Sequence, residues 1–113
     1  MKLNLRREET VMNLEEAVME SLRPVEDPEM KIGVVDLGLI YEVRINEEGP
    51  HAEIDMTLTS PGCPAAPEIM AAVHRAALAT EGINSVHVNL VWSPRWDPRI
   101  HASEDAQFEL GIF

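Results

Sequence analysis

The single cysteine, Cys63, is the residue of this sequence whose type and position most directly suggest chemistry. It lies in the run Ser60-Pro61-Gly62-Cys63-Pro64, where prolines restrict the backbone and Gly62 permits a close approach or a positive φ. An alternating pattern ends before this run and a helical pattern follows it, so we expect Cys63 at the amino end of a helix. Free amides and the helix dipole favour a thiolate there. The alternative is a small buried apolar residue, the commonest role of a free cysteine.

Histidines and carboxylates elsewhere in the chain form no clear constellation with Cys63. The histidines are His51, His74, His87 and His101. Their spacing defines neither a base for a cysteine nucleophile nor the paired ligands of a zinc site, and His74 and His87 are interpreted as surface residues. The run Glu26-Asp27-Pro28-Glu29 could supply carboxylates, or it could form an ordinary turn with solvated charges. A metal ion or cluster at Cys63 would therefore need ligands from elsewhere.

The two tryptophans, Trp92 and Trp96, lie in a short segment interrupted by Pro94 and Pro98. Tryptophan is enriched among the residues that dominate protein interfaces, and prolines lower the cost of ordering a segment on binding. The segment could therefore form a partner-binding surface near Cys63. The alternative is burial of these rings against the terminal helix.

Hydrophobic periodicity and turn residues divide the chain into the elements that would position these side chains. Asn13 and Glu16 have the spacing of a capping box at the start of a first helix, which Pro24 ends. The later elements are an ordered loop at 25–38, strands at 39–45 and 52–59, the main helix at 65–81, a third strand at 83–91, irregular chain at 92–98, and a short helix between Ser103 and Gly111. The short polar gap at 46–50 favours an antiparallel hairpin.

The order α-β-β-α-β-α predicts an α/β (α+β) fold, a two-layer sandwich in which helices cover one face of a small mixed sheet. The 113 residues are 45% hydrophobic, which suffices for one core. We therefore expect a single domain over residues 1–113, with residues 1–10 as a flexible N-terminal segment.

Charge and cysteine content exclude several classes of function. Nine Lys and Arg residues stand against 20 Asp and Glu residues, and the formal net charge of −11 disfavours binding to nucleic acid or anionic lipid. One cysteine cannot form an internal disulfide, and no long apolar run indicates a signal peptide or a membrane span. The sequence is typical of a protein of the reducing cytoplasm.

Four blocks of the sequence together resemble the MIP18 family, also known as the domain of unknown function DUF59. The blocks are Asp27-Pro28-Glu29, Val35-Asp36-Leu37-Gly38-Leu39-Ile40-Tyr41, Met56-Thr57-Leu58-Thr59-Ser60-Pro61-Gly62-Cys63-Pro64 and Leu90-Val91-Trp92-Ser93-Pro94-Arg95-Trp96. They occur in the family's order and extend over most of the chain. The resemblance implies the fold of iron–sulfur cluster assembly domains, in agreement with the predicted element order.

The resemblance also implies a function. Stand-alone bacterial members are SufT-like factors that assist iron–sulfur protein maturation, so the implied role is assembly or delivery of clusters to client apoproteins, without catalysis. The characteristic cysteine of the family falls on Cys63 and its acidic element on Asp27 and Glu29, while Thr59, Ser60 and Gly62 are the expected neighbours. The implied cofactor is a transient iron–sulfur cluster or iron, and the implied partners are iron–sulfur assembly proteins and client apoproteins.

Other functions remain open at this point. A PaaD-like accessory subunit of an oxygenase would carry an additional cysteine-bearing tail, which this chain lacks after Phe113. Cys63 could be an enzyme nucleophile, or it could be structural in an adaptor that binds clients through Trp92 and Trp96. We also expect a homodimer, because two-fold symmetry is the commonest arrangement of identical chains. A dimer could bring two copies of Cys63 to one interface or leave them far apart.

Overall fold

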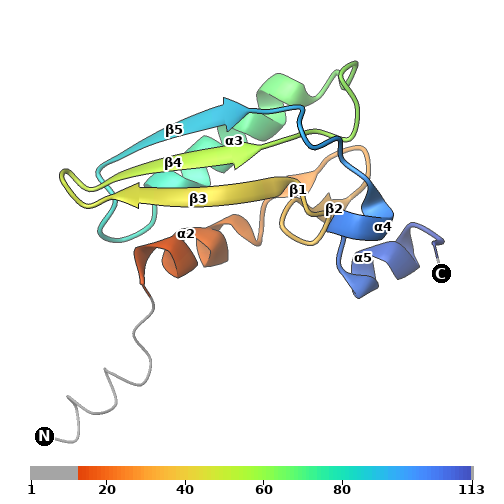
Figure 1. Cartoon of the computed structure of the whole chain (residues 1–113), viewed down its shortest axis with the longest axis horizontal. Helices are drawn as coiled ribbons and strands as arrows, with labels where there is room; N and C mark the ends of the chain where they lie inside the picture. The colour runs from red at the N-terminus through yellow and green to blue at the C-terminus, as the bar shows by residue number, and fades with distance from the viewer. Residues whose placement is uncertain (1–12, 113) are drawn as a thin grey trace, which may run out of the picture.

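The computed structural model describes residues 13–112, and the flexible segment expected at residues 1–10 lies outside this range. Figure 1 shows the elements along the chain. They are α2 (Leu14–Leu22), β1 (Glu26–Asp27), β2 (Ile32–Gly33), β3 (Ile40–Asn46), β4 (His51–Met56), α3 (Ala66–Leu78), β5 (Ser85–Leu90), α4 (Pro98–His101) and α5 (Glu104–Glu109). No helix within the described range is both long and apolar enough to cross a membrane.

The main sheet has the strand order β3-β4-β5. Strands β3 and β4 form the predicted antiparallel hairpin, whereas β4 and β5 are parallel and α3 connects them. Helices α2 and α3 lie on one face of this sheet, which confirms the predicted mixed two-layer fold (Figure 1). The start of β3 and the ends of β4 and β5 therefore lie at the same end of the sheet.

The apolar core lies between the sheet and its helices. On β4, Ala52, Ile54 and Met56 are fully buried, and the α3 residues Ile69, Val73 and Ala77 recur at helical spacing against them. Apolar side chains of α2 complete the layer.

Local signals explain where the helices begin and end. The amide of Glu16 donates to Asn13 Oδ1 at 2.8 Å and the amide of Asn13 donates to Glu16 Oε1 at 3.3 Å, so the predicted capping box is present. Helix α3 is shorter than the predicted span 65–81, because the chain leaves the helix after Leu78 and turns through Gly82 at φ 95°.

Two predicted irregular regions contain additional structure. The loop at 25–38 holds the antiparallel pair β1–β2, so its interpretation as a loop alone was wrong. Its tight turn is closed by the Lys31 amide, which donates to the Asp27 carbonyl at 2.7 Å. The irregular segment predicted at 92–98 leads directly into α4, where Asp97 caps the helix by accepting from the Arg99 amide at 2.9 Å.

Candidate functional site

Cys63 lies in the loop between β4 and α3, just before the helix starts at Ala66, as the sequence predicts. Its amide donates to the Ser60 carbonyl at 3.2 Å, and its carbonyl accepts from the Ala66 amide at 3.3 Å. The capping residue of α3, Ala65, makes no side-chain hydrogen bond to the helix. The cysteine is 8% exposed and belongs to the apolar core. Cys63 thus combines both predicted environments, because it precedes a helix and is also buried.

A surface pocket of about 290 Å³ lies next to this loop. Its lining residues come from the chain after β4 and the chain after β5, and they are Leu58, Thr59, Ser60, Pro61, Trp92 and Arg95. The amide of Val91 donates to the Met56 carbonyl at 2.8 Å, which continues the pairing of the two strands and holds both segments together. The expected neighbours Thr59 and Ser60 therefore line this pocket, and Gly62 lies exposed in the same loop.

The two tryptophans occupy different environments. Trp92 is 44% exposed and lines the pocket. Trp96 is half-buried against the core, and its Nε1–H donates to the Leu37 carbonyl at 2.7 Å. Trp96 therefore anchors the segment, while Trp92 presents an aromatic surface beside the Cys63 loop.

Asp27 is buried, at 1% exposure, and so the interpretation of its carboxylate as a solvated turn residue is wrong. Its Oδ1 accepts from the amides of Glu29 at 2.8 Å and Met30 at 3.1 Å, which makes it the organiser of the β1–β2 turn. Its Oδ2 is buried without a hydrogen-bond partner among the described residues. Glu29, in contrast, is exposed. Figure 1 places this turn at the end of the sheet where β3 begins.

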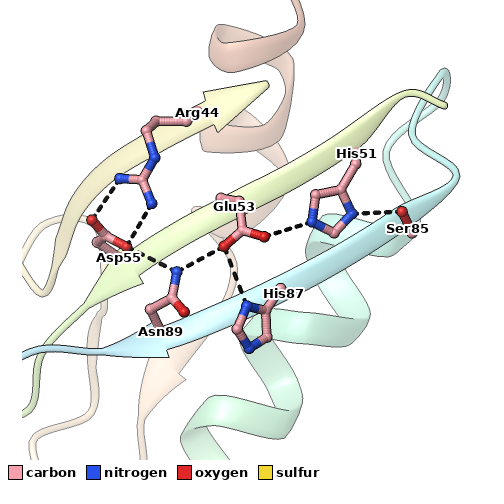
Figure 2. Close-up of polar contacts among 7 residues, drawn as sticks. All are labelled: Arg44, His51, Glu53, Asp55, Ser85, His87 and Asn89. Carbon is pink, nitrogen blue, oxygen red and sulfur yellow. Dashed lines mark hydrogen bonds and ion pairs between the residues drawn. The ribbon is translucent and has the colours of Figure 1, made fainter. Parts of the chain in front are cut away.

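The open face of the sheet carries a polar network centred on Glu53 (Figure 2). Its carboxylate lies 2.7 Å from His51 Nε2 and 3.2 Å from His87 Nδ1, and it accepts from Asn89 Nδ2 at 2.9 Å. His51 Nδ1 lies 2.6 Å from Ser85 Oγ. Hydrogen bonds from Asn89 and His51 hold the pKa of Glu53 down to about 2, so the residue is ionised at neutral pH.

A second carboxylate, Asp55, extends this network toward β3. The guanidinium of Arg44 binds both of its oxygens, at 2.6 and 3.1 Å, and lowers the pKa of Asp55. Asn89 bridges the two carboxylates, since its Nδ2 also donates to Asp55 Oδ1 at 3.0 Å. The alternation of polar and apolar residues along the strands predicts that one face of the sheet is polar. Which polar side chains touch one another depends on the parallel register of β4 and β5.

In the part of the chain that the structure describes, Cys63 has no histidine hydrogen-bonded to its thiol and no ready metal site beside it. His51 and His87 bond to Glu53, and His101 bonds to Asp97, so these three histidines are engaged away from the thiol. The same part of the chain holds no group of three His, Cys, Asp or Glu side chains placed to bind a metal ion.

Sequence comparison assigns the chain to a family. The family described as "Iron-sulfur cluster assembly protein" matches residues 15–90, which include β1 through β5 and the Cys63 loop. The chain therefore belongs to the iron–sulfur cluster assembly family, and the resemblance to the MIP18 family is confirmed.

Individual relatives agree with this assignment. The chain is 41% identical over 99 residues to the Fe-S protein maturation auxiliary factor YitW of Bacillus subtilis, covering 88% of this chain and 95% of that protein. It is 42% identical over 86 residues to the factor SufT of Staphylococcus aureus, covering 76% and 96%. The crystal structure of a DUF59 domain from Bacillus anthracis superposes with a TM-score of 0.79 at 38% identity, covering 88% and 93% of the two chains.

Proposed function

We propose that this protein is an accessory factor in iron–sulfur cluster assembly or delivery to client apoproteins, in which the Cys63 thiolate contacts iron during transfer. The observation that carries the proposal is the position of the lone cysteine, in a turn before α3 and beside the pocket that Trp92 lines. The names of the related maturation factors support the same role. We place its action in the cytoplasm, where a free thiol stays reduced.

Cys63 can serve as only one of the several thiolates that usually hold a cluster. Coordination during transfer is completed by thiolates of the donor or the client, by a second copy of the chain or by a small thiol. Each transfer step exchanges one iron–thiolate bond for another, so it needs no net oxidant or reductant. The protein then acts as a carrier or guide and not as a catalyst with its own substrate.

The pocket beside the cysteine provides a docking surface for the partner that gives or receives the cluster. Exposed Trp92 offers apolar contact area, and Arg95 is the cationic residue among those that line the pocket. Half-buried Trp96 keeps this surface in place. Docking here brings the ligands of the partner close to the Cys63 loop.

The test measures cluster transfer and client binding separately. A cluster donor and an apoprotein that requires a [4Fe–4S] cluster are mixed anaerobically with wild type, Cys63→Ser or the matched control Ala66→Ser, which adds a hydroxyl to the same turn region. We expect Cys63→Ser to slow transfer by about tenfold or more, as loss of a metal ligand should, while client binding persists. Unchanged transfer with Cys63→Ser contradicts the proposal.

Two tryptophan variants test the docking surface. Trp92→Ala should weaken client binding by more than ~1 kcal/mol with a stability change near ~0.5 kcal/mol, because the side chain is exposed. Trp96→Ala should destabilise the fold by about 3 kcal/mol, because it removes packing and the bond to Leu37. Equal client binding by Trp92→Ala and wild type would place the docking surface elsewhere.

The burial of Cys63 favours a second candidate, an adaptor whose cysteine is structural. The same measurements separate the two functions. An adaptor with a structural cysteine loses stability in Cys63→Ser, and its transfer activity falls only in proportion to the folded fraction.

A further inference from the structure

Strand β5 forms one edge of the main sheet, and within residues 13–112 no strand pairs with its outer side. Figure 1 shows it as the outermost strand, with α3 behind it on one face. The main-chain amides and carbonyls along such an edge can pair with another strand. Proteins usually block this pairing with charged residues, proline, a β-bulge or a covering segment.

The two edges of this sheet differ in these protective features. Strand β3 has a register irregularity between Ile40 and Glu42 and carries the charged residues Glu42 and Arg44. Strand β5, with the sequence Ser-Val-His-Val-Asn-Leu, contains no acidic or basic residue except a histidine and no proline, and it keeps a continuous register with β4 over its six residues. Among the described residues, the β5 edge is thus regular and has none of these protective features.

The apolar side chains of β5 are also incompletely covered. On neighbouring β4 the core-facing Ala52, Ile54 and Met56 are fully buried. Their register partners on β5 are Val86 and Val88, which are half-buried, and Leu90, which is 36% exposed. A further strand beside β5 would cover this open row of apolar side chains.

We propose that β5 pairs with β5 of a second copy of this chain in antiparallel orientation, which joins two three-stranded sheets into one sheet. The strand permits a second copy as the occupant, because β5 carries no carboxylate that would repel its counterpart, although the chain has a net charge of −11. The strand is also self-complementary. With Val88 opposite its own counterpart, Val86 lies opposite Leu90 on the helix side and His87 lies opposite Asn89 on the polar side.

This arrangement determines where the two Cys63 loops lie. Each loop follows β4 at the end of the sheet where its own β5 ends. Because paired antiparallel strands end in opposite directions, the two loops lie at opposite ends of the joined sheet. The six residues of β5 alone extend about 20 Å at about 3.3 Å per residue. The two thiols therefore cannot share one cluster, and each copy works with its own partner.

Dimerisation through β5 does not depend on cluster chemistry, so the dimer should also form in Cys63→Ser. Its test is sedimentation of the full chain over a wide concentration range, with hydrogen exchange on the same samples. We expect a species of twice the 12.6 kDa chain mass, and slower exchange of β5 amides at high concentration than at low concentration.

The edge is tested with the double variant His87→Lys and Leu90→Lys, since lysine protects natural sheet edges. The dissociation constant should rise by about tenfold or more, because a lysine at position 90 replaces the apolar contact of Leu90 with Val86 across the joined edge by a charged side chain. The matched control Asn46→Lys on β3 should leave it unchanged.

A mass of one chain at every concentration overturns the proposal. So does a dimer in which β5 amides exchange equally at low and high concentration. If the double variant does not fold, as judged by circular dichroism, the wild-type mass and exchange measurements still decide.

Discussion

At the scale of single residues, Glu53 connects most of the polar side chains on the open face of the sheet (Figure 2). Asn89, His51 and His87 each bond to its carboxylate, and these contacts favour the ionised form. The hydrogen bonds of Glu53 go to side chains of β4 and β5, whereas the Cys63 loop follows the end of β4. We therefore assign Glu53 a structural role.

This role predicts a pH dependence of folding stability. The pKa of Glu53 is about 2 in the folded protein, below the value of about 4.3 of an unfolded chain. The folded state thus binds the proton more weakly, and the stabilisation is complete above the unfolded pKa and is lost as pH falls toward 2. Urea unfolding across this range should show that Glu53→Gln is less stable than wild type at pH 7 and that the difference shrinks in acid.

Glu47→Gln, in the exposed β3–β4 turn, is the matched control and should follow the wild-type curve. A constant difference between Glu53→Gln and wild type at all pH values would show that ionisation of Glu53 does not contribute.

At the scale of elements, the segment from β5 to α5 is held across the end of the sheet by hydrogen bonds to residues far away in the sequence. The hydroxyl of Tyr41 donates to the Pro94 carbonyl at 2.9 Å, Trp96 bonds to Leu37, and the Ser103 amide donates to the Asp36 carbonyl at 2.7 Å. These contacts position Trp92 beside the Cys63 loop, so the docking surface depends on the close fit of this segment.

At Gly38 the chain packs so closely against α4 that no space remains for a side chain. The φ of Gly38 is 78°, and a Cβ there would collide with the backbone of His101 in α4. We expect Gly38→Ala to cost about 2–4 kcal/mol, from the positive φ and the displacement of α4 together. Gly111→Ala has a similar φ of 80° but no atom within 4 Å, so it should cost about 1 kcal/mol. Equal unfolding free energies of the two variants would contradict the close approach.

At the scale of the whole molecule, the net charge of −11 opposes the association of two copies. Raising ionic strength from about 0.01 M to about 0.1 M shortens the Debye length from about 30 to about 10 Å. We expect the dissociation constant of the dimer to fall over this range, as measured by sedimentation. The dissociation constant of a dimer held by ion pairs would instead rise with ionic strength. Such a rise would contradict pairing through β5, which carries no acidic side chain.

The local features of this protein could be predicted from its sequence. Helix α2 follows from the capping box at Asn13, the β3–β4 hairpin from two strand patterns around a polar turn, and the position of Cys63 from the change of pattern at Ser60–Pro64. These features depend on hydrogen bonds and backbone preferences within a few residues, which the order of side chains encodes directly. The four-block resemblance likewise identified the family that the comparison confirmed.

Contacts between distant segments could not be predicted from the sequence and are seen in the folded chain. The parallel pairing of β4 with β5 brings Glu53 beside His87 and brings the chain after Leu58 beside Trp92. The burial of Asp27 and the separate environments of Trp92 and Trp96 also depend on contacts between segments far apart in sequence. No local pattern specifies such contacts, because strand partners and buried surfaces are selected by the packing of the whole core.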